Sequence, residues 1–471
     1  MHHRARTFLF FILICIFCIG TPLVVLFSQG YRFDIKQKKI VQTGALHIKT
    51  KPSSAAIAIN GKQKRIRSSR FLYSGTVFRN LVPGNYNITI SSSSSLPWEK
   101  NISIEPSLVT KSTHVALPLS PPPTKTLFTS TSTFRYIAST NDEAFLVSSD
   151  KKSLFSQSLN DTSQKQIFPI PTATTTLEKS EIILSAFPSA STHNTLVNTN
   201  KKSYVISNGE TISLEKPLQT IANQNKAPVS RLLWHPFDDA ILFGFTSSAN
   251  YWIHLPDMTI GTFLKEKIIG WSSAGSRAYF LSAQGTLYEF STQLQPTSTP
   301  LTTIDPTLFS RFPLAIHALG DNRFVIHEPS GILLLIDIPS LHSELVDTAV
   351  KHLVISSDAS RMAYLTNDNQ LSAYSLEPTV DDSIYSQYEK IRLADIPENA
   401  NPLAIYFAND NWYLVLPTEW GAFITEIDKR LPLNLWVISF EKKIVPVAFR
   451  SQDAALIWQM DSTFSASRLL P

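Results

Sequence analysis

The hydrophobic pattern of the chain begins with an uncharged apolar run at residues 7–27, TFLFFILICIFCIGTPLVVLF. Its 21 residues match the roughly 20 that a helix needs to cross the hydrocarbon core of a bilayer. The run continues into LFSQGYRF without the A-x-A pattern of a signal-peptide cleavage site. We therefore expect an uncleaved transmembrane helix, with residues 1–29 as cytoplasmic N-terminus and membrane anchor. A cleaved signal peptide is the alternative.

Basic residues flank the apolar run on both sides: Arg4, Arg6, Arg32, Lys36, Lys38 and Lys39. Arg4 and Arg6 favour a cytoplasmic N-terminus, although the four basic residues after the run reduce the asymmetry. Long domains cross a membrane largely regardless of their charge. We therefore expect a single-pass cell-membrane protein whose bulk is extracytoplasmic.

After a connector at residues 30–43, apolar and polar residues alternate over short stretches. Leu46 and Ile48 alternate with polar residues in GALHIKTKP, and Ile57 and Ile59 share one face of the next strand. Asn60-Gly61 then supplies the positive φ angles of a tight hairpin turn. Several such strands predict a small antiparallel β-sandwich over residues 44–118.

A weaker pattern recurs through residues 125–471. An apolar strand ends, a mostly polar turn follows and a second apolar strand begins, as in RLLWHPFDDAILFGF and HLVISSDASRMAYLT. The first strands end near positions 138, 186, 234, 271, 317, 355, 406 and 449, about 44 residues apart on average. Four-stranded propeller blades recur at roughly 40–45 residues. The repeat predicts a seven- or eight-bladed β-propeller, so that the whole fold is mainly β.

The two ends of this repeat region complement each other. The last copy has three strands before the chain ends at Pro471, and KTLFTST at residues 125–131 precedes the first copy without a partner. Pairing these segments, with Thr126, Leu127 and Phe128 as the strand, would remove two exposed sheet edges. PLSPPPT at residues 118–124 favours an extended spacer, so residues 119–124 are predicted to be a linker that insulates the sandwich from the propeller.

The residues of the sandwich region resemble the PEGA-domain family. PSSA at residues 52–55 stands where that family has its Pro-Glu-Gly-Ala, and the central Glu and Gly are both Ser here. A second signature is matched by Leu81, Pro83, Gly84 and Tyr86. The resemblance covers residues 44–118. Because the family occurs in surface and envelope proteins and is not known for catalysis, it implies a spacer or recognition module.

The turn Ser356-Ser357-Asp358 in ISSDASRMAY resembles the Ser-Pro-Asp-Gly turn of TolB-like and WD-type propeller repeats. This resemblance covers residues 125–471 and is weak in each single repeat, because glycine is scarce in most of the turns. It implies a fold and carries no functional residues across.

Composition and the absence of certain motifs make several classes of function unexpected for this chain. Hydrophobic residues make up 43% of the chain and charged residues 17%, which suits packed cores. The net charge of +5 is spread out without a long basic block, so we expect no nucleic-acid partner. The only cysteines, Cys15 and Cys18, lie inside the apolar run. Neither G-x-S-x-G nor H-E-x-x-H occurs, and we expect no catalytic residues, no metal and no cofactor.

Two groups of residues are candidates for binding. The basic segment KQKRIRSSR carries five of them: Lys62, Lys64, Arg65, Arg67 and Arg70. These cations suit an anionic envelope polymer or lipid headgroups, and a solvated hairpin loop is the alternative. The aromatic residues around LPTEWG form the second group: Trp412, Tyr413 and Trp420. They suit contact with a ligand, and core packing is the alternative.

Together these patterns predict a membrane-anchored, extracytoplasmic binding or scaffold protein of a bacterial cell envelope. The propeller would present an interaction face to another envelope protein or to a glycan such as a cell-wall polymer. One alternative is a structural envelope component that contacts the cell wall through the PEGA-like module. The other is an extracytoplasmic propeller hydrolase, although we expect no enzyme.

Overall fold

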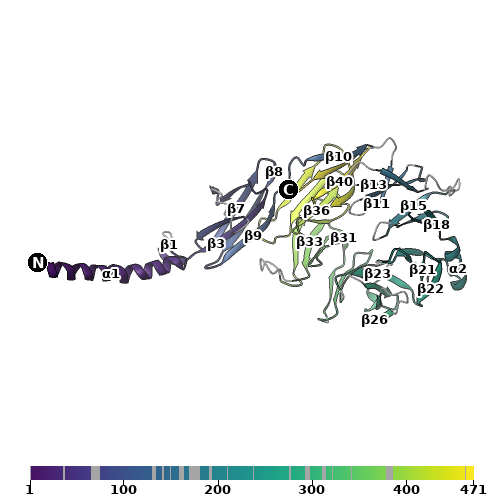
Figure 1. The fold of residues 1–471 in the computed structure, drawn as a ribbon, viewed down its shortest axis with the longest axis horizontal. Coiled ribbons are helices and arrows are strands. Elements are labelled where there is room, and N and C mark those ends of the chain that lie inside the picture. Colours follow the sequence, from purple (N-terminus) through teal and green to yellow (C-terminus); the bar gives the residue numbers. More distant parts are fainter. Residues whose placement is uncertain are drawn as a thin grey trace.

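The computed structural model describes residues 1–471 except 1, 35–37, 65–74, 130–133, 140–142, 149, 159–163, 169–180, 190–193, 209, 237, 275–276, 292–297, 310–313, 321, 341, 378–385 and 462. Figure 1 shows a single long helix, a small β-rich part next to it and a larger ring of sheets beyond. The chain is mainly β, as the sequence predicts.

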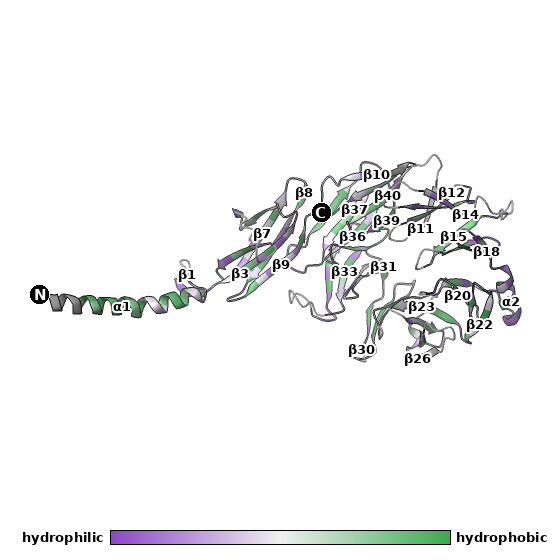
Figure 2. Cartoon of the chain, viewed as in Figure 1, coloured by the Kyte–Doolittle hydropathy of each residue, from purple (hydrophilic) through white to green (hydrophobic). Residues whose placement is uncertain are grey.

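Helix α1 (His2–Ser28) contains the predicted apolar run and projects away from the rest of the chain (Figure 1). Within its stretch Phe8–Ser28, 18 consecutive residues have a mean hydropathy of 2.9, and none of these is buried against other parts of the protein. Apolar residues occupy most of its length in Figure 2. Its length and composition suit a membrane span, and a signal sequence near an N-terminus shares both properties.

A short hairpin follows α1. Its strands are β1 (Tyr31–Asp34) and β2 (Lys39–Gln42), which pair antiparallel. The next part contains two small sheets. One consists of β3 (Gly44–Lys51), β6 (Thr76–Leu81) and β9 (Val109–Ala116). The other consists of β4 (Ala56–Ile59), β5 (Lys62–Lys64), β7 (Gly84–Ser92) and β8 (Ser95–Ile104).

The tight turn predicted between the first two strands of the second sheet is present. Ile59 pairs with Lys62, and the two residues between them, Asn60 and Gly61, have φ angles of 49° and 72°. Gly84 also has a positive φ, 148°, as expected for the Pro83-Gly84 turn. Leu46 and Ile48 are buried, as their alternation with polar residues predicts.

The prediction that these strands are all antiparallel is wrong for one pair. β3 and β9 run parallel, with Leu46 opposite Thr110 and Ile48 opposite Ser112. The chain alternates between the sheets: after β3 it forms β4 and β5 in the second sheet, returns with β6, forms β7 and β8 in the second sheet and returns again with β9. β6 pairs antiparallel with one edge of β3, and β9 pairs parallel with the other edge. Alternation identifies a buried face of a strand and says nothing about the direction of its partner.

Residues beyond 124 form consecutive four-stranded groups, here called sheets in chain order. The first has β11 (Phe134–Ser139), β12 (Glu143–Ser148), β13 (Leu154–Ser158) and β14 (Gln164–Phe168). The second has β15 (Ile183–Pro188), β16 (Asn194–Thr199), β17 (Ser203–Ser207) and β18 (Glu210–Ser213). The third has β19 (Arg231–Trp234), β20 (Ile241–Phe245), β21 (Asn250–His254) and β22 (Thr259–Leu264).

The next sheets continue the order. One has β23 (Ile268–Ala274), β24 (Arg277–Ser282), β25 (Thr286–Ser291) and β26 (Ser298–Thr303). Another has β27 (Leu314–Ala318), β28 (Arg323–His327), β29 (Leu333–Asp337) and β30 (His342–Asp347). It is joined to the one before it by parallel pairing of β23 with β27.

The last sheets complete the chain. One has β31 (Val350–Ile355), β32 (Arg361–Thr366), β33 (Gln370–Ser375) and β34 (Lys390–Asp395). Another has β35 (Tyr406–Ala408), β36 (Tyr413–Thr418), β37 (Gly421–Glu426) and β38 (Leu435–Ser439). The final one has β39 (Val445–Arg450), β40 (Ala455–Met460), β41 (Thr463–Arg468) and β10 (Thr124–Thr129).

Each turn of the predicted repeat connects the first two strands of one of these sheets. At three of these turns the paired residues lie seven positions apart: Ala138 with Phe145, Ile355 with Met362 and Phe449 with Leu456. One helix in this part was not predicted. It is α2 (Glu215–Asn225), which buries Pro217 and Ile221 before the third sheet begins. Two short 3-10 helices, Pro306–Leu308 and Glu398–Ala400, also occur between strands.

The sheets close into a ring. β10 pairs antiparallel with β41, with Thr124 opposite Ser467, so the predicted pairing of the first and last strands is confirmed. Hydrophobic clusters lie between successive sheets, and one cluster joins the first sheet to the last through Leu146, Ile457 and Phe464. Because no sheet of this kind can bury both faces alone, closure of the ring covers the faces that single sheets would expose.

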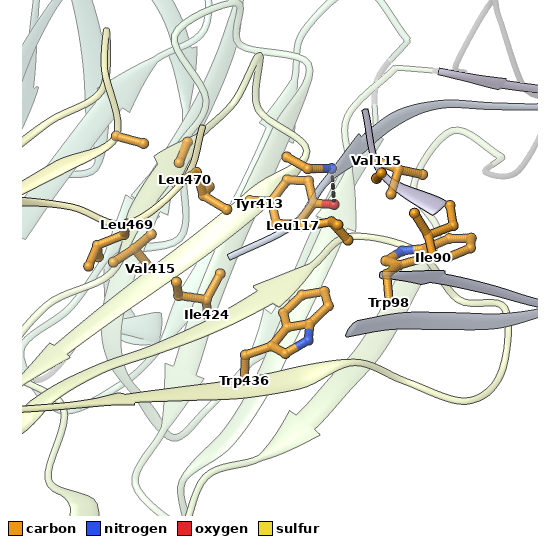
Figure 3. Packing of buried hydrophobic residues seen from close by; sticks show 14 of the residues in the cluster. Ile90, Trp98, Val115, Leu117, Tyr413, Val415, Ile424, Trp436, Leu469 and Leu470 are labelled. Atoms are coloured by element: carbon orange, nitrogen blue, oxygen red, sulfur yellow. Dashed lines mark hydrogen bonds between the residues drawn. The ribbon is translucent and has the colours of Figure 1, made fainter. Parts of the chain in front are cut away.

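The proline-rich segment does not separate the two β parts. Leu119 donates its backbone N–H to Leu469 O at 2.9 Å, and Ser120 donates to Ser94 O at 3.0 Å. One hydrophobic cluster contains Ile90, Trp98 and Leu117 together with residues of β36, β37, β38 and β40 and with Leu469 and Leu470 (Figure 3). The prediction of an insulating spacer is therefore wrong, because the segment lies in the contact between the two parts rather than across a gap.

Candidate functional site

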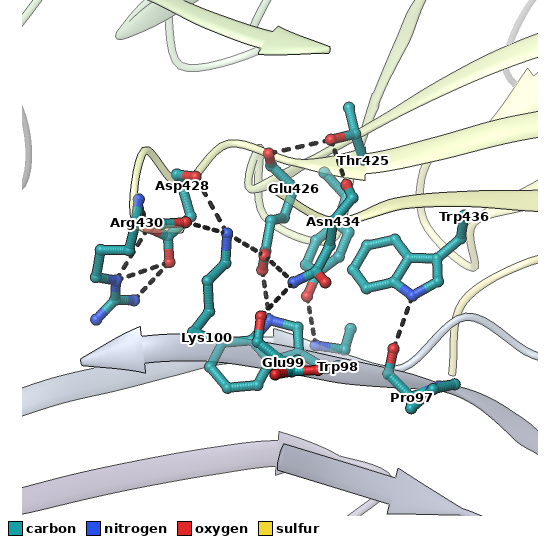
Figure 4. Close-up of polar contacts among 12 residues, drawn as sticks. Pro97, Trp98, Glu99, Lys100, Thr425, Glu426, Asp428, Arg430, Asn434 and Trp436 are labelled. Carbon is teal, nitrogen blue, oxygen red and sulfur yellow. Dashed lines mark hydrogen bonds and ion pairs between the residues drawn. The ribbon is translucent and has the colours of Figure 1, made fainter. Parts of the chain in front are cut away.

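Polar side chains are buried where β8 meets the sheet β35–β38 (Figure 4). We call this region the docking face and define it by Trp98, Lys100, Glu426, Asn434 and Trp436. Alternation along β8 points Trp98 and Lys100 to the same side, and both are fully buried. Glu426 ends β37, a strand that is buried along its whole length.

The centre of the docking face is a buried ion pair. Lys100 Nζ lies 2.8 Å from Glu426 Oε1 and also donates to the backbone carbonyl of Arg430 at 2.7 Å. The other oxygen, Glu426 Oε2, accepts from the Trp98 indole N–H at 2.6 Å. Asn434 Nδ2 donates to Oε1, also at 2.6 Å. A buried charge is tolerable only with such a set of partners, because its desolvation costs several kcal/mol.

Electrostatics at this pair follow from burial. Loss of contact with water raises the pKa of the Glu426 carboxyl, the nearby Asp428 carboxylate adds to that rise, and the Lys100 ammonium opposes it. Asp428 in turn pairs with Arg430, whose Nη2 lies 2.5 Å from Asp428 Oδ2. The arrangement holds two segments together, and the side chains of Lys100 and Glu426 at its centre are only 0% and 7% exposed.

Two aromatic residues extend the contact. Trp436 donates its indole N–H to the carbonyl of Pro97 at 2.9 Å. Tyr413 is buried, and its hydroxyl oxygen accepts from the backbone N–H of Ala116 at 2.8 Å. Burial raises the pKa of the Tyr413 phenol well above its usual value. The docking face therefore joins β8 and β9 on one side to β36, β37 and β38 on the other.

The structure separates Trp420 from the other two predicted aromatic candidates. Trp412 and Tyr413 lie at the start of β36, and Trp420 lies in the turn after its far end. Trp412 stacks on His114 with ring centroids 4.2 Å apart, and Arg361 lies 4.0 Å from its ring on another side. Trp412 and Tyr413 thus contact the N-terminal β part. Trp420 is 59% exposed and remains open to a partner.

The basic candidates are only partly described. Lys62 and Lys64 lie on the short strand β5 and are exposed. Arg65, Arg67 and Arg70 lie outside the described residues, so a basic binding surface here stays a prediction. No described contact joins Lys62 or Lys64 to the aromatic candidates.

Sequence reasoning missed the docking face. A lysine at a buried position of the alternating strand WEKNISI, and a glutamate ending the apolar run GAFITE, each point to a buried partner. Alternation cannot say which partner, because Trp98 and Glu426 lie 328 residues apart in the chain. Only the structure therefore shows that these two segments lie against each other.

A pocket of about 520 Å³ opens between the ends of β19 and β23. Arg231, Leu233, Lys267 and Trp271 are among the residues that line it. Partial burial lowers the pKa of the Arg231 guanidinium. An apolar wall with two cationic side chains would suit a small anionic or aromatic group. Among the described residues, no three His, Cys, Asp or Glu side chains gather closely enough to hold a metal ion.

Comparisons with known proteins give no family: no family model matches the chain, and no curated protein matches it. Solved structures of similar shape include the computationally designed Ika8 protein, at 11% identity and a TM-score of 0.45 over 73% of this chain and 98% of that chain. The β-propeller domain of Cps50 (Swd1) from Myceliophteria thermophila has 10% identity and a TM-score of 0.37 over 74% of this chain and 99% of its own.

PorZ, a bacterial surface component of the type-IX secretion system of Porphyromonas gingivalis, has 14% identity and a TM-score of 0.38. That likeness covers 69% of this chain and 40% of PorZ. At such low identities and TM-scores, these likenesses carry no argument about function. The propeller-like fold rests on the strand pairing and on the hydrophobic clusters between the sheets.

Proposed function

We propose that the chain is a membrane-anchored, extracytoplasmic binding or scaffold protein of a bacterial cell envelope. Residues 1–29 hold it in the membrane, and residues 30–43 connect the anchor to a PEGA-like β-sandwich at residues 44–118. Residues 119–124 link this module to a β-propeller at residues 125–471. The propeller presents an interaction face to another envelope protein or to a glycan.

The docking face is the observation that carries this proposal. A scaffold can hold a partner at a set position relative to the membrane only if its parts do not swing freely. The buried pair of Lys100 and Glu426, with the shared hydrophobic cluster around it, fixes the ring to the module next to α1. Inter-domain motion is the usual expectation unless hydrophobic contacts hold the parts together, and here residues of both parts share one hydrophobic cluster.

The strand order supports eight blades. Seven groups of four sequential strands run from β11 to β38, and β39–β41 form an eighth group with β10. β23 and β27 also pair with each other, which joins two of these groups into one continuous sheet. β10 precedes the first blade in the sequence but completes the last one. This closure ties the first and last blades together, which favours a rigid platform for binding.

Site-specific photo-crosslinking in intact cells tests the proposal. A photo-reactive residue in place of the exposed Trp420 should give a discrete crosslinked product with an envelope protein or glycan. A photo-reactive residue in place of Lys62, an exposed residue of the basic candidate segment, tests the alternative site on the module. Crosslinks from Lys62 alone, to cell-wall polymer, would favour a structural role of the module instead.

Protease treatment of the same cells tests the orientation. Removal of the propeller from intact cells is expected, because the bulk of the chain would face outward. Fragments that appear only after lysis would contradict the extracytoplasmic placement, and with it the proposed class of partners.

A further inference from the structure

An apolar pair is exposed immediately after α1. Phe33 on β1 and Ile40 on β2 are direct cross-strand partners in the hairpin that follows the helix. Partners in an antiparallel pair project from the same face, and their side chains are 64% and 61% exposed. A two-stranded hairpin is marginally stable in water. Two large apolar side chains on its open face therefore call for another apolar surface to cover them.

The hairpin is held firmly at the end of the helix. The Arg32 guanidinium lies over the Phe27 ring at 3.4 Å and donates to the carbonyl of Phe27 at 2.8 Å. It also donates to Asn80 Oδ1, on β6, at 3.2 Å. Thr43 donates its backbone N–H to Gly30 O at 2.9 Å. Figure 1 shows β1 beside the last turns of α1, so the hairpin itself lies next to the end of the helix.

Cationic side chains lie near the hairpin and the end of α1. Lys38 and Lys39 are exposed at the beginning of β2. Arg79 and Lys111 line a pocket of about 780 Å³ between the end of α1 and the first β part, together with Gly30 and Leu108. Leu108 is itself 55% exposed. Apolar side chains flanked by cations at the end of a membrane-spanning helix match the boundary between acyl chains and anionic headgroups.

We propose that this hairpin and the adjoining pocket bind anionic phospholipids of the leaflet in which α1 ends. Phe33 and Ile40 enter the boundary between headgroups and acyl chains. Lys38, Lys39 and Arg79 contact the phosphates. The inference rests on the proposed membrane anchor, because the apolar pair reaches a bilayer only if α1 spans one. It adds a second attachment, which sets the tilt of the module and hence of the docked ring.

Spin labels on the full-length chain test the proposal. Cys15→Ser with Cys18→Ser removes both native cysteines, and single cysteines are then placed at three positions. Ile40→Cys reports on the hairpin, Ile19→Cys on the middle of α1, and Trp420→Cys on an exposed turn of the propeller. The labelled proteins are reconstituted into phosphatidylcholine vesicles with and without phosphatidylglycerol. Collision of each label with oxygen and with a nickel chelate is measured by power saturation.

The Ile40 label is expected to prefer oxygen over the nickel chelate several-fold more than the Trp420 label does. Phosphatidylglycerol should increase that preference, and Lys38→Gln with Lys39→Gln should abolish the increase. An Ile19 label within the hydrocarbon and an Ile40 label as aqueous as Trp420 would overturn the lipid contact while the anchor stands. An aqueous Ile19 label would overturn the anchor itself, and the lipid contact with it.

Discussion

The docking face and the contact between the sheets β19–β22 and β23–β26 both bury aromatic side chains, but they are built differently. In the second contact, Phe243, Phe280 and Phe290 meet edge to face, with Phe243 and Phe280 centroids 5.5 Å apart and Phe280 and Phe290 centroids 5.4 Å apart. Edge-to-face rings need no hydrogen-bond partners. At the docking face, Trp98 and Trp436 use their indole N–H groups, and an ion pair lies between the strands.

The difference follows from what each contact joins. The phenylalanine cluster lies between successive sheets of the ring, so chain connectivity already places its members close together. The docking face joins segments about 300 residues apart, and buried polar partners can specify one alignment of two surfaces that a purely apolar contact would leave free to slide. We therefore expect the docking face to be sensitive to the loss of one polar partner and the phenylalanine cluster to be sensitive to volume.

The largest expected effect is that of Glu426→Leu, which leaves the Lys100 ammonium buried without its carboxylate. Breaking one partner of a buried pair typically costs about 3–5 kcal/mol. Urea unfolding of the full-length chain in detergent micelles would measure it. A variant within about 0.5 kcal/mol of the unmodified protein would show that the pair is solvated in solution.

Trp98→Phe is expected to have a smaller effect. It keeps a six-membered aromatic ring but removes the five-membered ring of the indole, with the N–H that donates to Glu426 Oε2. A hydrogen bond to a charged group is worth roughly 1.5–3 kcal/mol. Tyr413→Phe serves for comparison, since it removes one polar atom from an aromatic ring in the same contact, with little change in volume, and leaves only the neutral Ala116 N–H unpaired. Equal losses for the two variants would contradict a special role for the charged acceptor.

Phe280→Leu tests the other region. It removes fewer atoms than a change from Phe to Ala, which costs about 3–5 kcal/mol, so we expect a loss of about 1–2 kcal/mol. The loss should scale with the cavity left and should not depend on salt. A strong dependence on ionic strength would indicate that this cluster contains an electrostatic contribution that its contacts do not reveal.

Replacing both charges together is expected to cost less than Glu426→Leu alone. Lys100→Met with Glu426→Leu removes the desolvation penalty along with the attraction. Because the Trp98 N–H and the Arg430 carbonyl still lose their partners, we expect a loss of about 1–2 kcal/mol. A double variant as unstable as Glu426→Leu alone would mean that Trp98, Asn434 and the Arg430 carbonyl, rather than the ion pair, dominate the docking face.

The smallest expected effect is the pH dependence of the ring's stability. Burial lowers the pKa of His317, and the nearby His327 lowers it further. The unfolded chain, in which this histidine keeps a pKa of about 6.5, then binds a proton that the folded ring does not. Stability should therefore fall as pH drops below about 6.5, and His317→Gln should flatten that slope. Thermal unfolding at pH 7.5 and 5.5 would measure both; an unchanged slope would assign the dependence to other groups.

Much of the ring could be predicted from the sequence, because each sheet repeats one local pattern. The rule against exposed edges predicted the pairing of β10 with β41. In the module, turn chemistry predicted the positive φ angles at Asn60 and Gly61. The parallel pairing of β3 with β9 did not follow, because alternation carries no direction. The docking face could not be predicted from the sequence either. Lys100 and Glu426 each indicate a buried partner, but the sequence does not show which residue that partner is. Prolines at residues 121–123 suggested a spacer, although their neighbours bond to both parts.

The central claim is that the module and the ring form one cooperative unit. Hydrogen exchange of the full-length chain and of Gly84→Val tests it most directly. Gly84 has a φ of 148°, which a β-branched residue resists, while its added side chain would meet open space. The variant therefore strains β7 without a clash. If the shared cluster couples the parts, peptides from β8 and from β37 should lose protection together. Loss confined to β8, with β37 unchanged, would contradict the claim.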